Sequence, residues 1–206
     1  AGKSTIINIL TSLVMKSKGQ VQVLGHDLDR EVHEVRKKLG LVPQEFNFNL
    51  FEKNIDILTQ QAGYYGIPRK LALKRSEKYL KLLGIWSYRN EVPRSLSGGL
   101  KRRLLIARAM VHEPPILIFD EPTAGVDVEL RKVIWNFLTE LNQAGKTIIL
   151  TTHYLEEAEK LCRRVAIIDH GKIIVQSTID EIIDKLPKIK YLIKVHTKNS
   201  KLDVSQ

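Results

Sequence analysis

The sequence is dominated by short apolar segments, each long enough for one β-strand, that alternate with segments of helical periodicity. The clearest of them, Ile116–Phe119, has four consecutive apolar residues and is followed directly by two acidic residues. A continuous apolar run of this length is typical of a strand buried on both faces of a parallel sheet. The alternation therefore predicts an α/β fold with a mostly parallel sheet flanked by helices. With 206 residues, the chain is long enough for one domain with a substantial core.

One internal region breaks this alternation. Between Phe46 and Gly84 the strand patterns disappear, and two helical patterns, about Leu50–Gly63 and Pro68–Leu83, meet at a Gly-Ile-Pro break. We therefore predict a helical subdomain, about residues 46–112, inserted into the α/β core. Further elements are predicted outside it. They include a helix over Lys3–Met15, a helix over Asp29–Lys38 with Asp29 as N-cap, a brief strand over Leu39–Val42 that Pro43 stops, a hairpin of Val165–Asp169 and Lys172–Gln176 around His170–Gly171, and a last strand over Tyr191–Val195.

The first residues match the end of the phosphate-binding pattern G-x-x-x-x-G-K-[ST], because Gly2, Lys3 and Ser4 stand directly before a predicted helix. In that pattern backbone N–H groups and the lysine surround phosphates at the helix N-terminus. Lys3 would reach the β- and γ-phosphates, the Ser4 hydroxyl would bind Mg²⁺, and Thr5 would offer a hydroxyl to the α-phosphate. In isolation, an ordinary capped helix would explain these residues equally well. The first glycine of the pattern and the strand before it would precede residue 1, so we expect an N-terminally truncated domain with weakened nucleotide affinity.

Two acidic residues, Asp120 and Glu121, follow the apolar strand. The carboxyl end of a parallel strand is where open α/β sheets bind ligands. There Asp120 suits a second-shell role toward Mg²⁺, and Glu121 suits the polarisation of an attacking water. A strand that simply ends in a polar turn before Pro122 is the alternative, and the phosphate-binding pattern upstream favours the functional interpretation.

A second candidate anion site is formed by Ser97, Gly98 and Gly99, which precede a strongly periodic helix over about Leu100–Val111. Paired glycines allow a backbone to approach a phosphate closely, and a helix start presents exposed N–H groups. Three cations, Lys101, Arg102 and Arg103, lie in the first turn, where the helix dipole disfavours positive charge; we interpret them as a sign of an anionic partner. An N-cap serine followed by a flexible glycine pair is the alternative.

Charge and composition restrict the function only loosely. The net charge of +10 fits a partner such as nucleic acid or an anionic membrane surface, but it equally fits a solvated basic surface. No apolar run approaches the roughly 18 residues that a membrane-spanning helix needs. The single cysteine, Cys162, cannot form an internal disulfide, which fits a reducing cytosol.

Taken together and in order, these motifs resemble those of ATP-binding-cassette (ABC) ATPases over essentially the whole chain. The matching segments are the Walker A remnant Ala1–Thr5, the Q-loop Gln44, the signature Leu96–Leu100, the Walker B strand Ile116–Asp120 with Glu121, the D-loop ending at Asp127, and the switch His153. The signature continued by Lys101–Leu104, with Tyr64–Pro68 upstream, is similar to the ABC-2 subgroup of exporters. Taken singly, Gln44 and His153 would mean little.

The resemblance implies a P-loop (RecA-like) fold and a shared mechanism. Two copies would dimerise head to tail and enclose two ATP molecules. Each ATP would contact Gly2–Thr5 of one copy and Ser97–Gly99 of the other. The subunit would lie peripherally on the cytoplasmic face of the inner membrane and power an integral membrane permease, with no nucleic acid as partner.

The resemblance also implies individual roles for the remaining motif residues. Glu121 would orient the attacking water and His153 would hold the γ-phosphate. Gln44 would sense Mg²⁺, alongside Ser4 and Asp120 at the metal, and would couple the site to the permease. Asp127 would support contacts across the dimer.

Two departures and one alternative accompany the resemblance. Leu100 stands where many relatives carry glutamine, and the aromatic residue that usually stacks on adenine is expected upstream of residue 1. The alternative is a cassette ATPase that acts on nucleic acid or ribosomes. Against it, only about ninety residues separate Lys3 from Ser97, without the sustained heptads of a coiled coil.

Overall fold

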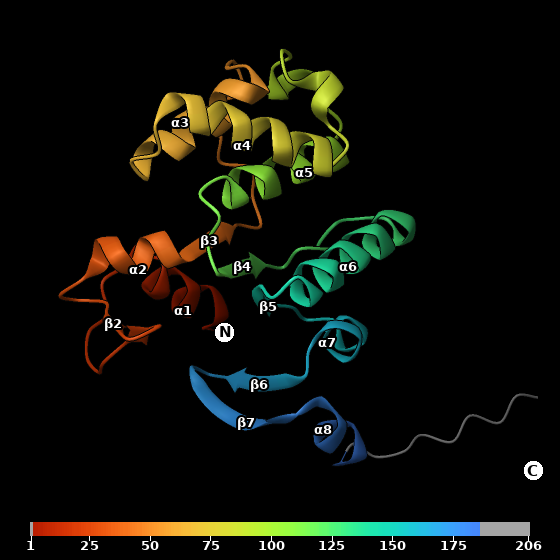
Figure 1. Ribbon diagram of the computed structural model, residues 1–206. Helices are drawn as coiled ribbons and strands as arrows, with labels where there is room; N and C mark the ends of the chain where they lie inside the picture. The colour runs from red at the N-terminus through yellow and green to blue at the C-terminus, as the bar shows by residue number, and fades with distance from the viewer. Residues whose placement is uncertain (1, 186–206) are drawn as a thin grey trace, which may run out of the picture.

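The computed structural model describes residues 2–185, and a three-stranded parallel sheet lies at its centre (Figure 1). Its strands are β3 (Leu39–Val42), β4 (Ile116–Asp120) and β5 (Thr147–Thr151), in the order β3-β4-β5. The register pairs Leu39 with Ile116 and Ile116 with Thr147. The prediction of a parallel α/β core is thus confirmed.

The central strand β4 is buried on both faces, as its apolar run predicts. Leu117 and Phe119 face a large apolar cluster shared with α5 (Gly98–Met110) and α6 (Val128–Gln143). Ile116 and Ile118 face a smaller cluster, shared with α1 (Lys3–Leu10) and α2 (Val32–Lys38). Successive residues of a strand point to opposite faces, so one uninterrupted apolar run can serve two layers of helices.

The strandless region forms a group of helices at the top of Figure 1. It contains α3 (Asn54–Tyr64), α4 (Arg69–Leu82), the short 3₁₀ helices η1 (Trp86–Tyr88) and η2 (Pro93–Ser95), and α5. Helix α5 belongs to both parts, because it packs against α3 and α4 and also against β3. A displacement of α5 relative to the sheet would therefore change its packing against β3.

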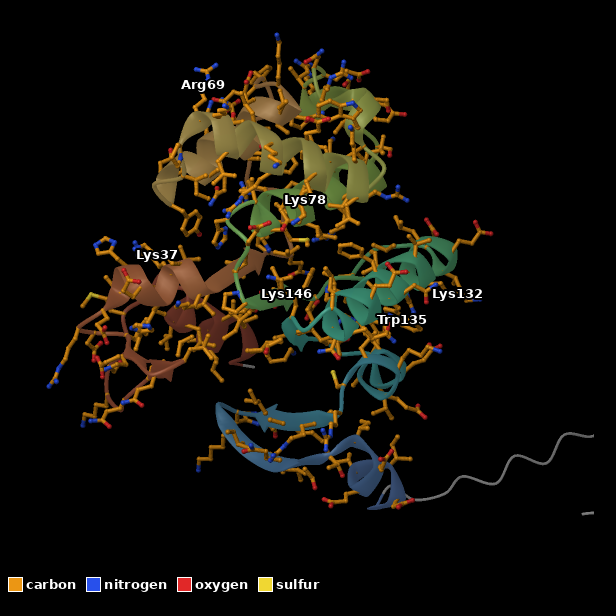
Figure 2. The ribbon with its side chains drawn as sticks, in the orientation of Figure 1. Lys37, Arg69, Lys78, Lys132, Trp135 and Lys146 are labelled. Carbon is orange, nitrogen blue, oxygen red and sulfur yellow. The ribbon has the colours of Figure 1, made fainter. Side chains whose placement is uncertain are left out.

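A polar joint links these helices to the sheet through the segment between α5 and β4. Glu113 pairs with Arg75 at 2.8 Å and with Lys78 at 2.7 Å, both from α4 (Figure 2). The neighbouring His112 stacks on Tyr65, with ring centroids 3.7 Å apart, and its Nε2 lies 2.9 Å from the carbonyl oxygen of Leu39. Burial lowers the pKa of His112 to about 4, which keeps this ring neutral at physiological pH.

Two antiparallel hairpins flank the core, β1 (Gln22–Val23) with β2 (His26–Asp27), and β6 (Arg164–Asp169) with β7 (Lys172–Thr178). The second hairpin turns at His170–Gly171, as predicted, and follows α7 (Leu155–Leu161); helix α8 (Ile179–Lys185) comes after it. Between β5 and β6 lies a groove of about 1080 Å³ whose lining also includes Lys3.

Three helix boundaries were predicted wrongly, and one of them is the start of α3, which begins at Asn54 and not near Leu50. Helix α1 ends at Leu10, because the backbone of Ser12 turns into the left-handed region (φ 58°) and the Leu13 N–H bonds back to the Asn8 carbonyl at 2.8 Å. Helix α2 begins at Val32, and Asp29 does not cap it. The carboxylate of Asp27 instead accepts the N–H of Asp29 at 2.9 Å in a separate turn.

Two of the segments named in the sequence predictions extend beyond residues 2–185. The predicted strand Tyr191–Val195 lies outside the described residues, as does Ala1 of the phosphate-binding pattern. Within residues 2–185, none of the helices has the length and apolarity needed to cross a membrane.

A buried carboxyl group joins α6, α7 and the turn after β4. Glu157 on α7 is 1% exposed, and its Oε1 accepts hydrogen bonds from the Thr123 hydroxyl and from the Trp135 indole N–H, both at 2.9 Å (Figure 2). Because Thr123 lies two residues beyond Glu121, this cluster fixes the turn that carries the acidic pair.

Removal of that carboxyl group is expected to destabilise the protein. Glu157→Ala leaves a buried O–H and a buried N–H without an acceptor and opens a small cavity, at a cost of about 3 kcal/mol. The melting temperature, measured by circular dichroism, should fall by about 10 °C. Glu159→Ala, at an exposed position of the same helix, is the control and should melt like the wild type. Equal shifts in the two variants would contradict this account.

Candidate functional site

The candidate residues from the sheet gather at one edge, where three adjacent parallel strands end. Gln44 follows β3 and His153 follows β5. Asp120 is the last residue of β4, and Glu121 comes directly after it. In open α/β sheets this carboxyl edge is the usual place for a ligand. The parallel topology therefore brings together residues that are up to 109 positions apart in the chain (153 − 44 = 109).

Glu121 is the centre of this group. Its Oε2 accepts a hydrogen bond from the Gln44 amide at 3.3 Å and lies 3.4 Å from Nδ1 of His153. The Glu121 side chain keeps 21% of its surface exposed, so a small molecule can still reach it. Its backbone adopts a left-handed conformation (φ 48°), which is uncommon for a residue with a side chain and is often found at functional sites.

Thr151, the last residue of β5, holds both acidic residues in place. Its hydroxyl donates to the carboxylate of Asp120, and its carbonyl oxygen accepts the Glu121 N–H at 3.1 Å. Thr151 was not among the site residues predicted from the sequence. The available signal was its position, because the last residue of the neighbouring parallel strand is in register with Asp120.

The N-terminus of α1 lies on the groove between β5 and β6, where Gly2 is next to Ile168 and Gly171 of the second hairpin. Gly2 precedes the helix in a left-handed conformation (φ 112°), and Ser4 and Thr5 in the first turn are exposed. Helix α1 packs against β4, and Lys3 lines the groove that His153 also lines. An exposed helix start with no acidic residue in its first turn attracts anions.

The remaining candidates, Ser97, Gly98, Gly99 and Asp127, lie apart from the groove that Lys3 and His153 line. Ser97 and Gly98 are exposed, and the Ser97 hydroxyl accepts the Leu100 N–H at 3.4 Å as the N-cap of α5. Asp127 caps α6 in the same way, because its carboxylate accepts the Leu130 N–H at 2.8 Å. The side chain of Leu130 in turn lies against Gly99. These four residues thus form a separate exposed surface with two helix starts.

The interpretation of the basic residues that follow Gly99 was wrong for Arg102. Its side chain is buried (6% exposed) and donates to the carbonyl oxygens of Pro43 and Gln44, each at 2.9 Å. These carbonyl oxygens, and not an anionic partner, are therefore its hydrogen-bond acceptors. Arg103 donates to the Leu83 carbonyl at 3.3 Å. A charge pattern alone does not reveal burial, although Arg102 lies four residues before the buried Ile106 and so shares its side of the helix.

The arrangement can support attack by water on an anionic group. Glu121 offers a carboxylate as general base, with a histidine and an amide within 3.4 Å of it. Lys3 and the start of α1 offer positive potential on the groove that this histidine, His153, also lines. Within residues 2–185, no three His, Cys, Asp or Glu side chains cluster in a way that could hold a metal ion by themselves.

Comparison with known proteins agrees with this geometry. The family model described as "ABC transporter" matches residues 1–124. The chain is 37% identical over 186 residues to Nod factor export ATP-binding protein I of Ralstonia nicotianae, covering 89% of this chain and 57% of that protein. It is 36% identical to linearmycin resistance ATP-binding protein LnrL of Bacillus subtilis, covering 90% of this chain and 60% of that protein. The chain thus spans less than two thirds of the length of either relative.

A solved structure is similar as well. It is described as the dimeric, post-hydrolysis state of the ATP-binding cassette MJ0796 bound to ADP and Pi. The TM-score is 0.77 at 27% sequence identity, and the match covers 86% of this chain and 81% of the other. The similarity therefore extends over nearly all the described elements.

Proposed function

The chain belongs to the ABC transporter family, and on that basis we propose that it hydrolyses ATP to power an ABC-2-type exporter whose membrane part is another polypeptide. One observation carries the proposal: Gln44 and His153 both lie within 3.4 Å of one carboxylate oxygen of Glu121, and His153 lines the same groove as Lys3. The names of the relatives, export and resistance ATP-binding proteins, support the direction of transport.

In this proposal the first residues of α1 bind the nucleotide phosphates. Backbone N–H groups from Gly2 onward and the Lys3 ammonium would surround the β- and γ-phosphates, and Thr5 would contact the α-phosphate. Glu121 would take a proton from the attacking water, and His153 would hold the γ-phosphate.

The residues at the sheet edge also fit Mg²⁺. Ser4, Gln44 and Asp120 offer only oxygen ligands, which this ion prefers, and Mg²⁺ is usually held by one or two carboxylates together with substrate phosphates. When bound, the ion would neutralise phosphate charge.

A second copy of the chain would complete each site. Ser97–Gly99 form an exposed helix start that is separate from Lys3, so in a head-to-tail dimer they could face the phosphates bound by the partner. Asp127, beside Gly99 through Leu130, would support the contact between copies. The dimeric assembly of the similar cassette supports this arrangement.

We place the membrane subunit against the helical subdomain, about residues 46–112, on the cytoplasmic face of the membrane. Phe46, Leu50 and Phe51, all in the segment before α3, keep 41%, 40% and 72% of their surfaces exposed, and gatherings of exposed large apolar side chains mark interaction surfaces. These exposed residues lie in or directly after the loop that carries Gln44, so a partner bound there could respond to a change in the position of Gln44.

Co-purification tests the partner. The protein expressed from its complete reading frame, isolated from detergent-solubilised native membranes, should bring with it a subunit that has membrane-spanning helices, identified by mass spectrometry. Phe51→Asp should weaken this association at least about tenfold, as expected for the loss of a central aromatic contact. Val133→Asp, at an exposed apolar position on α6, should not. Tight RNA or DNA binding that survives roughly 0.2 M salt, without a membrane partner, would instead favour the nucleic-acid alternative.

A further inference from the structure

The loop that carries Gln44, residues 43–48, is held by two arginines of a single helix. Arg102 and Arg108, both on α5, reach across to this loop, which leads from β3 toward α3. The position of Gln44 therefore depends on contacts that the loop makes with α5.

Arg102 fixes the start of the loop. Its guanidinium donates one N–H to the Pro43 carbonyl and another to the Gln44 carbonyl, each at 2.9 Å. The two acceptors belong to successive residues, so the planar fork of the guanidinium constrains the orientation of the peptide that joins them. The guanidinium also lies 5.3 Å from the centre of the Phe46 ring, and the residue is only 6% exposed.

Arg108 holds the far end of the loop. Its guanidinium donates to the Asn47 carbonyl at 3.2 Å and also to the side-chain oxygen of Asn47. It lies 5.8 Å from the ring centre of Phe48, which packs in turn near Phe46. With both ends tied to α5, the loop is expected to follow that helix when it shifts.

These contacts complete a physical connection through one chain. It starts at Ser97, the N-cap of α5, and passes through Arg102 to the backbone of Gln44. It then continues through the Gln44 amide to the carboxylate of Glu121 at 3.3 Å. Arg102 lies five residues after Ser97, little more than one helical turn, so the helix transmits displacement between them as a rigid body.

We propose that Arg102 is a positioning residue that couples the exposed N-terminus of α5 to Glu121 through the backbone and side chain of Gln44. The inference rests on the proposed function, because it assigns α5 as the element that a second copy's nucleotide would engage. Arg102 itself does not touch the reacting atoms. It acts by keeping the Gln44 amide directed at the catalytic carboxylate.

The test is a double-mutant cycle on the protein expressed from its complete reading frame. Arg102→Met removes both donors and is expected to lower kcat for ATP hydrolysis on the order of 10- to 100-fold, with KM changed less than about threefold. Gln44→Ala should have a similar effect. Because both substitutions interrupt one connection, the double variant should match Gln44→Ala alone to within about twofold.

Arg89→Met is the matched control. Arg89 also donates to a backbone carbonyl, that of Trp86 at 3.3 Å, and also lies over an aromatic ring at 4.7 Å, but no hydrogen bond joins it to residues 43–48. Its kcat should stay within about twofold of the wild type. If Arg102→Met does not fold, the cycle is run with Arg102→Lys, which retains charge and length and should lower kcat by about three- to tenfold.

The outcomes distinguish a failure of the positioning role of Arg102 from a failure of the proposed ATPase function. If the effects of Arg102 and Gln44 multiply in the double variant, or if the Arg102 variants keep wild-type kcat, the positioning role is wrong while the ATPase proposal stands. If the wild-type protein shows no ATP hydrolysis that depends on Glu121, the proposed function itself fails.

Discussion

Glu121→Gln is expected to lower ATP hydrolysis by about 10³-fold while leaving ATP binding and ATP-driven dimerisation intact. Glutamine has the shape of glutamate and can still meet the Gln44 amide and His153, which lie 3.3 and 3.4 Å from the carboxylate oxygen. It cannot take a proton from water. The substitution therefore removes the general base and leaves the binding surfaces of α1 and α5 unchanged.

Phosphate release measures the first half of this result, and light scattering with and without ATP measures the second. Glu129→Gln, an exposed glutamate in the first turn of α6, is the control and should hydrolyse ATP at the wild-type rate. A Glu121→Gln variant that retained more than about a tenth of the activity would exclude Glu121 as the base. A variant that no longer dimerised with ATP would indicate a structural role instead.

The strands that carry the site could be predicted because a parallel strand that is buried on both faces has a continuous run of apolar residues. Leu39–Val42 and Ile116–Asp120 have the predicted bounds, since both faces of the sheet demand apolar side chains and the next residue is polar or proline. Once those strands are placed side by side, the ends that bear Gln44 and Glu121 must be neighbours. The contact between them follows from topology and needs no information beyond the strand order.

Other features depend on backbone turns and burial that no local pattern reveals. Helix α1 stops early at a left-handed serine, Ser12, where propensity alone would continue the apolar periodicity to Met15. Arg102 occupies a basic run that suggests exposure, yet it is buried because two carbonyl oxygens of a distant loop satisfy it. Thr151 acquires its role only because β5 lies next to β4. Each of these outcomes is decided by a partner far away in the sequence.

Two inactive variants are expected to restore activity when they are mixed. In a head-to-tail dimer each site combines Lys3 of one copy with Ser97 of the other, so Lys3→Ala and Ser97→Arg each destroy both sites of their own homodimer. Each variant alone should retain about a hundredth of the activity or less. A mixed dimer places both substitutions in one site and leaves the second site with wild-type residues throughout. Random pairing at equal concentrations should therefore restore about a quarter of the wild-type sites.

The control for this complementation uses the same proteins with a different pairing. Lys3→Ala mixed with Glu121→Gln should restore nothing, because both residues serve the site from the same copy and every mixed dimer then carries one defect in each site. The separation seen in the structure requires this contrast: Lys3 lines the groove near His153 and Glu121, whereas Ser97 begins an exposed helix elsewhere. If neither mixture recovered activity, Ser97 would have to act within its own chain, or both sites would have to be intact at once. If both mixtures recovered, Lys3 and Glu121 would have to serve one site from different copies, and the proposed division of residues between the two copies would be wrong.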